Sequence, residues 1–512
     1  MKRNNLIKGL LCLSILSFNI GCTNLDEEIL DGVSNDTSGG GTINTAATLQ
    51  SAYEGLRTFN GQGGHFALSE MSTDALVGPT RGGDWDDNGA WRQIHTQTWA
   101  PDHVEVKNAW NDLLSNVYKC NLVIENNGTA SEVLQARFLR AFYYYNVVDL
   151  FGQAPYRPAG SDILADPLVW SRAEATDFII SELEAIVPSL PARVANDASI
   201  VNVDAAHFLL AKVYLNKGVF KAADVAGTYT FDAADMTKVV QHVDALTTTL
   251  ASSYWDNFAP TNNTSSEVIF SSKNVTGGPG GNTQSRWRMC NHYNQTPSGW
   301  NGFATVAEYY NKFDASDARA KHSTPAIITA FGNPVGFQVG QQYAPGGVTP
   351  LKDRIETDAY PDGQPLIFTP ALTLITSGAT LESAGIRGVK YIPDSNNRDA
   401  PNNDLVWMRH SDALLMKAEA IARGGSGSVG TIMSDIAARA GVTAAPSTLD
   451  GIYAERGREL WWEGWRRNDM IRFGTFLNAR GLKPYTSSSK YLLFPIPAEA
   501  LFNANLKQNP GY

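Results

Sequence analysis

Two stretches of helical periodicity limit what this chain can fold into. Over residues 136–151, large apolar side chains recur every three or four positions, with alanines where a neighbouring helix can approach closely. Gly152 and Pro155 follow and predict the end of that helix. Residues 205–217 repeat the pattern before Gly218, which predicts a second helix end. The chain has no regular 34-residue period, yet it favours a scaffold of paired, tetratricopeptide-like helices.

Composition divides the rest of the chain. Residues 22–45 are acidic and then rich in Ser and Gly, which predicts a flexible linker. Residues 46–255 form an N-terminal helical part, and residues 401–512 form a C-terminal helical part that closes the same domain. Residues 256–400 are rich in Gly, Asn, Ser, Thr and Pro, and predict ordered loops with a few short strands. The predicted fold is therefore mainly α, with a loop-rich region as the ligand face.

The N-terminus predicts secretion. Three basic residues surround the start of an apolar run over residues 6–20, which is too short to span a bilayer. Gly21 and Cys22 follow, so residues 1–21 are predicted to be a lipoprotein signal peptide and Cys22 the site of lipid attachment. An ordinary cleaved signal that happens to contain Cys22 is the alternative.

Charge and motifs exclude several function classes. The formal net charge is −10 over 512 residues, so the chain lacks the basic footprint of a nucleic-acid binder. It contains no His-Glu-x-x-His pair, no Gly-x-Ser-x-Gly elbow and no phosphate-binding Gly-x-x-x-x-Gly-Lys loop. His95 and His103 lie close in sequence without a ligating partner at metal spacing, so we interpret them as ordinary polar residues.

Two questions stay open at this stage. Loop carboxylates at Asp84, Asp86 and Asp87 are compatible with a structural calcium ion, and no other cofactor is predicted. Cys120 and Cys290 either form a disulfide, which an oxidising compartment permits, or remain buried free thiols.

A charged motif near the C-terminus is the strongest candidate for catalysis. Glu455, Glu459 and Glu463 lie at i, i+4 and i+8, the spacing of one helical stripe. A carboxylate pair of this kind resembles the acid and nucleophile of a retaining glycosidase. The same stretch also carries charged partners, namely Arg466, Arg467, Asp469 and Arg472. Arginines lower carboxylate pKa values, which is the wrong direction for a general acid, so we predict a structural ion-pair network and no enzyme.

Two loops combine aromatic and polar side chains in the way that sugar-binding sites do. The first contains Arg81, Asp84, Trp85, Asn88 and Trp91, and the second contains Trp287, Tyr293 and Trp300. A flat ring stacks on the C–H face of a sugar, while carboxylates, amides and guanidinium groups bind its hydroxyls. We therefore predict these eight residues as ligand contacts; the alternative is that the loop tryptophans pack inside the protein.

Several motifs together resemble the SusD/RagB family. They are Phe138 to Pro155, Ala211 to Leu215, the Arg409-led segment ending in Ala418-Glu419-Ala420, the Glu455 to Arg472 motif, and the closing Gln508-Asn-Pro-Gly-Tyr512. A short acidic run after Cys22 also resembles the signal that directs Bacteroidetes lipoproteins to the cell surface. The resemblance covers both ends of the mature chain and is weakest over residues 256–400.

The resemblance implies a function. A SusD-like chain would be a surface-exposed outer-membrane lipoprotein that binds oligo- or polysaccharide. It would act as the lid of a SusC-like TonB-dependent transporter and pass the glycan into the barrel. Three alternatives remain: a RagB-like peptide-binding protein, a surface glycoside hydrolase, and an assembly scaffold without a ligand.

Overall fold

The structure is a computed structural model that describes residues 43–158, 161–162, 164–278, 282–373, 375–378 and 380–512. The leader, Cys22 and the linker up to residue 42 lie outside the described residues, so the signal and lipid-attachment predictions are not tested by it. Among the described residues, no helix combines the length and the apolar character needed to cross a membrane.

The described chain is mainly helical. Its α-helices are α2 (Thr45–Glu54), α3 (Gly64–Phe66), α4 (Ala90–Thr96), α5 (Val104–Glu125), α6 (Ala130–Phe151), α7 (Arg172–Ile186), α8 (Val203–Phe220), α9 (Ala233–Asp244), α10 (Ser285–Arg288), α11 (Ala307–Tyr310), α12 (Pro325–Phe331), α13 (His410–Ala422), α14 (Ile432–Ala440), α15 (Leu449–Glu459) and α16 (Arg466–Arg472). Shorter turns include the π-helical turn η2 (Ala67–Met71), and the 3-10 turns η3 (Asp87–Gly89) and η8 (Ala498–Phe502).

The strands are short and antiparallel. They are β1 (Gln153–Tyr156), β2 (Leu168–Ser171), β3 (Val268–Ser272), β4 (Lys321–His322), β5 (Val335–Gln338), β6 (Gly340–Gln341), β7 (Ile367–Phe368), β8 (Arg387–Val389) and β9 (Leu405–Arg409). They form the pairs β1–β2, β3–β9 and β6–β7, and the three-stranded sheet β4–β5–β8. The β3–β9 ladder is irregular and brings together strands more than a hundred residues apart in sequence.

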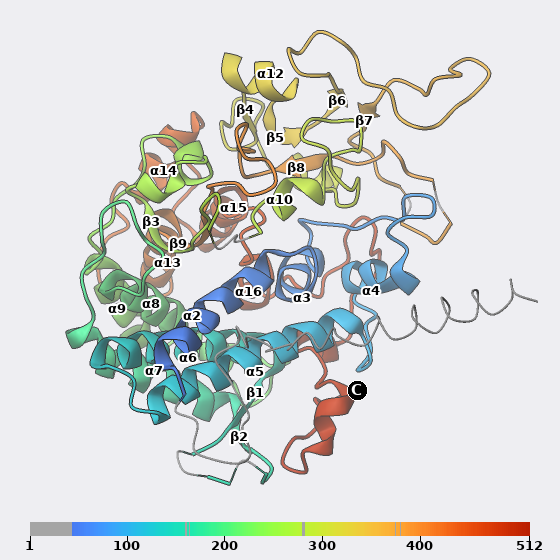
Figure 1. Ribbon diagram of the computed structural model, residues 1–512. Coiled ribbons are helices and arrows are strands. Elements are labelled where there is room, and N and C mark those ends of the chain that lie inside the picture. Colours follow the sequence, from blue (N-terminus) through green and yellow to red (C-terminus); the bar gives the residue numbers. More distant parts are fainter. Residues whose placement is uncertain (1–42, 159–160, 163, 279–281, 374, 379) are drawn as a thin grey trace, which may run out of the picture.

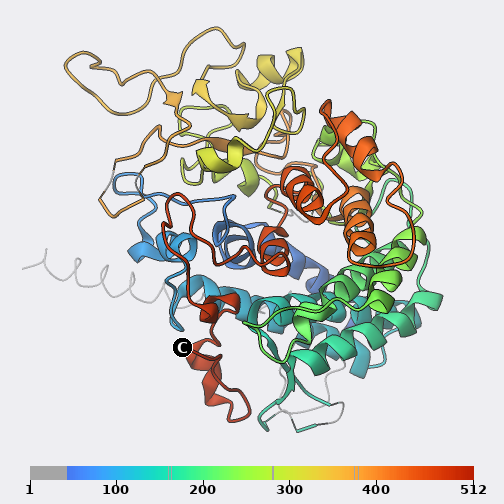
Figure 2. The same cartoon turned by 180° about the vertical axis from the view of Figure 1, so that it is seen from behind.

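Successive helices pack side by side. α5 packs on α6, α6 on α7, α7 on α8 and α8 on α9, and α13 then continues the array by packing on α9 and α15. Figures 1 and 2 show this helical layer on one side of the molecule, with β4 to β8 and α12 on the other. The prediction of a mainly α fold with tetratricopeptide-like pairs, long loops and a few strands is confirmed.

Local sequence explains where the long helices begin. Thr129 and Ser171 start α6 and α7 with capping boxes. In each box the hydroxyl of the cap residue accepts a hydrogen bond from the backbone N–H three residues later. The glutamate at that later position accepts a hydrogen bond from the backbone N–H of the cap residue. α6 is buried on every side from residue 141 to residue 151, because helices cover one face and the C-terminal segment covers the other. Gly152 then ends α6 with a φ of 71°, as its sequence position predicts.

The closing motif fixes the C-terminal segment on α6. The Asn509 side-chain amide donates to the carbonyls of Phe151 and Phe494 at 2.9 and 2.7 Å. The Tyr512 hydroxyl donates to the Leu493 carbonyl at 3.0 Å and accepts from the Trp99 indole at 2.7 Å. The end of the chain thus satisfies the backbone carbonyl of the last residue of α6 and two carbonyls of the C-terminal segment itself.

Two boundary predictions were wrong. α8 continues through Gly218 to Phe220. A Cβ at Gly218 would lie 2.2 Å from the Thr230 carbonyl oxygen, so this glycine permits close approach of a loop rather than ending the helix. The charged motif is also not one helix: α15 ends at Glu459, and α16 begins only at Arg466.

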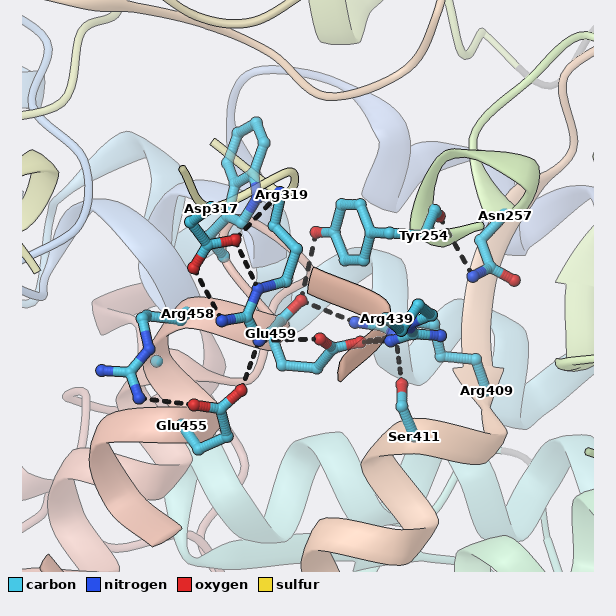
Figure 3. Close-up of polar contacts among 12 residues, drawn as sticks. Tyr254, Asn257, Asp317, Arg319, Arg409, Ser411, Arg439, Glu455, Arg458 and Glu459 are labelled. Carbon is cyan, nitrogen blue, oxygen red and sulfur yellow. Dashed lines mark hydrogen bonds and ion pairs between the residues drawn. The ribbon is translucent and has the colours of Figure 1, made fainter. Parts of the chain in front are cut away.

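The charged motif forms the predicted ion-pair network (Figure 3). Arg409 donates to Glu459 at 2.6 Å, to Glu267 at 2.8 Å and to Glu463 at 2.7 Å. Arg439 and Arg319 add further ion pairs to Glu459. Burial opposes ionisation of Glu459, but these three arginines hold its pKa well below the usual range. The network therefore joins β9, α14 and α15, and Glu459 has the wrong protonation state for a general acid.

Further arginines and carboxylates extend the network to other helices and to the turn after η2. Arg466 contacts Asp74, Arg467 contacts Asp149, and Arg472 contacts both Glu419 and Asp469. All three arginines are buried. Cys120 and Cys290 are both buried and free, so the disulfide alternative is excluded in this structure.

Candidate functional site

The first predicted loop is a tight turn with strained residues. Arg81 and Asp84 exchange backbone hydrogen bonds of 2.8 and 3.2 Å around Gly82 and Gly83. Trp85 follows with a φ of 60°, a left-handed conformation that is rare for a bulky side chain. Asp87 and Asn88 also have positive φ values, of 40° and 52°. Strain of this kind persists only where the surroundings impose it, and it concentrates at binding sites.

Contacts from the second loop hold Trp85 in place. Its indole N–H donates to the Trp300 carbonyl at 2.8 Å. Its ring lies 5.7 Å from that of Trp91 and 5.0 Å from that of Phe303, measured between centroids. A Cβ at Gly302 would lie 2.4 Å from two atoms of the Trp85 ring, so the indole rests directly on this backbone. The two predicted loops, more than two hundred residues apart, therefore form one site.

Tyr293 and Asp84 connect the loops at one end of the site. The Tyr293 hydroxyl donates to Asp84 at 2.6 Å. Burial and the Asp84 carboxylate raise the pKa of Tyr293, so the phenol stays protonated and remains the donor. The Arg354 guanidinium lies 3.9 Å over the Tyr293 ring and contacts Glu382 at 3.4 Å. Arg354 thus covers one face of the tyrosine.

These side chains line an open groove of about 590 Å³, which we call the aromatic groove. Its lining residues are Gln62, Asp84, Trp85, Asp87, Ala90, Trp91, Val104, Glu105, Tyr293 and Trp300. Trp300 and Val104 are 37% and 50% exposed, which is unusual for large apolar side chains. α4 and the first residues of α5 form one side of the groove. They lie beside the part of the molecule that contains β4 to β8 and α12, which we call the loop layer (Figure 1).

Five of the eight predicted contacts line the aromatic groove: Asp84, Trp85, Trp91, Tyr293 and Trp300. Asn88 is exposed on the η3 turn but is not among the lining residues. Trp91 is only 5% exposed, and its indole N–H donates to Asp87. Ligand contact by these residues remains a prediction.

Two predicted contacts need correction, because the structure places them inside the protein. Trp287 is 0% exposed and belongs to the core. Arg81 is 3% exposed, and its guanidinium donates to the carbonyls of Gly302, Leu381 and Ala384. Burial and the neighbouring Arg387 lower the pKa of Arg81. Arg81 therefore supports the loop under Trp85 instead of facing a ligand.

Sequence reasoning missed the groove residues that come from other elements. Gln62 precedes α3, and Val104 and Glu105 begin α5. Their local sequence indicates only a turn and a helix start, so the sequence contains no signal that links them to Trp85. Asp87 and Ala90 lie inside a predicted loop but were not predicted to contact a ligand.

The three loop aspartates do not converge on one point. Asp84 accepts from Tyr293, Asp86 accepts from Arg92, and Asp87 accepts from Trp91. Within the described ranges, no group of three or more His, Cys, Asp or Glu side chains is arranged to hold a metal ion. His95 and His103 each bond a backbone carbonyl, of Leu76 and Ala90 respectively.

Fold and site together define a class: a helical-repeat scaffold with an open aromatic groove where its N-terminal helices meet its loop layer. Two family models match the chain, "SusD family" over residues 247–491 and "Starch-binding associating with outer membrane" over residues 29–215. The chain belongs to the SusD/RagB family.

Individual relatives agree with this assignment. The chain is 25% identical over 492 residues to the "Starch-binding protein SusD" of Bacteroides thetaiotaomicron, covering 87% of this chain and 85% of that protein. A SusD superfamily protein from Parabacteroides distasonis has the same fold, with a TM-score of 0.69 at 19% identity, covering 91% of this chain and 98% of its own. Surface glycan-binding protein A from Bacteroides thetaiotaomicron, solved with laminarihexaose, matches at a TM-score of 0.66 and 21% identity over 91% and 98%.

Proposed function

We propose that this chain is a surface-exposed outer-membrane lipoprotein that binds oligo- or polysaccharide in the aromatic groove. The observation that carries the proposal is the groove itself, in which exposed ring faces stand beside carboxylates on a strained loop. The relatives support it, because one is named a starch-binding protein and another was solved in complex with laminarihexaose. The family description of association with the outer membrane supports the location.

Each part of the groove has a role in this proposal. Trp85, Trp300 and the free face of Tyr293 would stack on the C–H faces of sugar rings. Asp84, Asp87 and Glu105 would accept hydrogen bonds from sugar hydroxyls, which are stronger to a charged acceptor than to a neutral one. We assign no catalytic residue: the most prominent carboxylate cluster, around Glu459, is buried and paired with arginines.

The rest of the proposal follows from the family and the leader. Lipid on Cys22 would tether the protein, and the linker after it would let the folded body reach ligand away from the membrane. A SusC-like TonB-dependent transporter would be the partner that receives the glycan, with this chain as its lid.

A glycan panel tests the proposal. The chain from residue 23 onward would be measured against polysaccharides by affinity electrophoresis, and against their oligosaccharides by calorimetry. Trp85→Ala and Trp300→Ala should each weaken binding of the recognised glycan about tenfold or more. Tyr360→Ala is the matched control, since Tyr360 is a 44% exposed aromatic of the loop layer outside the groove.

The outcomes separate the alternatives. Binding that survives both tryptophan variants, with folding intact by circular dichroism, would contradict the assigned site. Absence of binding to every glycan in the panel would favour a peptide ligand, or binding that requires the transporter. Release of shorter sugars during incubation would contradict a purely binding role.

A further inference from the structure

The polar lining of the aromatic groove consists almost entirely of hydrogen-bond acceptors. Three of its side chains are carboxylates, Asp84, Asp87 and Glu105. Among the described residues, no Lys, Arg or His lines the groove. Of the lining side chains in the described part of the chain, the Gln62 amide alone has both N–H donors and a carbonyl acceptor.

The aromatic donors of the groove are largely used inside the protein. The Trp85 indole donates to the Trp300 carbonyl at 2.8 Å, and the Trp91 indole donates to Asp87. The Tyr293 hydroxyl donates to Asp84 at 2.6 Å. A ligand therefore meets ring faces and carboxylate oxygens, but few groups that can donate to it.

Among the described residues, the cations nearest the groove each contact a group of the protein, although the Arg354 side chain stays 56% exposed. At the rim, Arg354 lies over Tyr293 and contacts Glu382 at 3.4 Å and Asp84 at 3.8 Å. Arg92 is paired with Asp86 at 2.5 Å, and Lys107 with Glu499 at 2.7 Å.

Two more cations lie beneath the loop rather than on it. Arg81 donates to the carbonyls of Gly302, Leu381 and Ala384. Arg387 donates to the Asn301 side chain at 2.9 Å and to the Gly385 and Ala384 carbonyls at 3.0 and 2.7 Å. Both guanidinium groups are buried, so they weaken the negative field of the groove without offering a hydrogen bond to its occupant.

We propose that the aromatic groove selects uncharged, hydroxyl-rich glycans and excludes glycans that carry carboxylate or sulfate groups. The proposal rests on the glycan-binding function proposed above and names the ligand class within it. A neutral sugar presents hydroxyl donors to the three carboxylates and C–H faces to the rings. An acidic substituent would lose water next to carboxylates and would find few donors among the lining side chains, and like charges brought together at an interface weaken binding.

A matched pair of ligands tests this selectivity. The neutral glycan that binds best in the panel would be compared with the same glycan after oxidation of its primary C6 hydroxyls to carboxylates. Calorimetry at low ionic strength should give the oxidised form an affinity at least about tenfold weaker. Salt at about 0.5 M should recover part of that loss, because it screens exposed charges, and should change neutral-glycan binding little.

A charge-removing variant gives a second readout. Asp84→Asn keeps the shape and an oxygen for the Tyr293 hydroxyl, and it adds an N–H donor. The ratio of neutral to oxidised affinity should fall severalfold in this variant, even if both affinities drop. Asp177→Asn on α7 removes an exposed carboxylate outside the groove and should leave the ratio unchanged.

The outcomes distinguish this inference from the function beneath it. Equal or tighter binding of the oxidised glycan, with the neutral form still bound, would overturn the selectivity and leave the glycan-binding function standing. Absence of binding by any neutral glycan would overturn both. A ratio that is insensitive to salt in the unmodified protein would also overturn the role of charge, whether or not Asp84→Asn folds.

Discussion

Trp85 is held in an unfavourable backbone conformation by the loop beneath it. Left-handed strain at a bulky residue costs about 1–3 kcal/mol, and several contacts offset it here. The Trp300 carbonyl accepts from the indole, and the ring rests on Gly302. Arg81 in turn holds the Gly302 carbonyl at 3.2 Å through its Nε. The position of the ring is therefore set from behind, by the backbone of Trp300 and Gly302 and by the buried Arg81.

Gly302→Ala should weaken glycan binding without removing any ligand contact. The added methyl group would overlap two atoms of the Trp85 ring at 2.4 Å, so the indole must move out of its position. We expect an affinity loss of about fivefold or more, together with a shift in tryptophan fluorescence, both measurable by titration. Gly83→Ala is the matched control, because a Cβ at Gly83 meets nothing within 4 Å. Unchanged affinity in Gly302→Ala would show that the Trp85 position is not limiting.

Glu70 is a second residue in unfavourable surroundings, which in this case oppose ionisation of its carboxyl group. It is fully buried in η2, where one carboxylate oxygen accepts from the Gly464 N–H at 2.6 Å and the other has no hydrogen-bond partner. Burial raises the pKa of Glu70 to about 8, against modest opposition from that hydrogen bond and nearby cations. The folded protein thus holds a proton on Glu70 that the unfolded chain releases near pH 4.5.

Glu70→Gln should therefore become more stabilising as pH rises. Between about pH 4.5 and 8 the folded state binds more protons at this site than the unfolded state, so wild-type stability falls with pH there. The neutral amide lacks this dependence, and its advantage should grow to a few kcal/mol at about pH 8. Urea unfolding of both proteins at several pH values measures the difference. A constant difference across that range would contradict a raised pKa.

At the residue scale, the sequence alone identified part of the groove through aromatic residues that lie outside any helical periodicity. Trp85, Tyr293 and Trp300 stand in loops without helical periodicity, and all three line the groove. Arg81 resembled a ligand donor for the same reason. Its acceptors are backbone carbonyls brought together only by folding, so no local signal could separate the two roles.

At the scale of elements, buried ion pairs connect the C-terminal helices to the loop layer. Arg409 at the end of β9 is 1% exposed and bonds carboxylates from three different segments. Removing one partner of such a cluster leaves uncompensated buried charge, which is far more costly than loss of a surface pair.

Arg409→Met should destabilise the fold by about 3–5 kcal/mol. The change preserves much of the side-chain volume but leaves Glu267, Glu459 and Glu463 without their shared guanidinium. Arg398→Met is the matched control, because Arg398 is exposed and should change stability by less than about 0.5 kcal/mol. Guanidinium or thermal unfolding compares the two variants. A loss below 1 kcal/mol in Arg409→Met would mean that the network is structurally dispensable.

Elements differ in how far the sequence predicted them. α6 and α8 were predicted because their apolar periodicity is local. The helix break between Glu459 and Arg466 was not, since Trp462 adopts a φ of 58° against Gly388, a contact made only in the folded protein. The β3–β9 ladder joins segments over a hundred residues apart, so no local pattern could pair them.

At the scale of the whole molecule, buried titrating groups set how stability responds to acid. His65 and His95 are buried, and burial lowers their pKa values to about 4 and about 3. Each stays neutral in the folded protein while the unfolded chain protonates near pH 6.5, so each costs stability as pH falls below that value.

Buried carboxylates act at lower pH. Burial opposes ionisation of Glu267, but Arg439 and Arg409 overcome it and lower its pKa to about 2. Its contribution is fully present above the unfolded pKa of about 4.5 and is lost as pH falls towards 2. A shift of this size corresponds to roughly 3 kcal/mol. Burial also opposes ionisation of Glu419 and Asp412, but Arg472 lowers the pKa of Glu419 and Lys212 lowers that of Asp412, so both add to this loss.

The free energy of unfolding should therefore peak near about pH 6.5 and fall on both sides. The acid side should steepen below about pH 4.5, where the carboxylates join the histidines. The decrease in the free energy of unfolding between about pH 6.5 and 8 should be small. It should be absent in Glu70→Gln, because ionisation of Glu70 causes it. Denaturant titrations from about pH 3 to 8 would trace the curve. If the acid limb also vanished in Glu70→Gln, or if stability rose steadily to pH 8 in the wild type, the buried groups named here would not control the response.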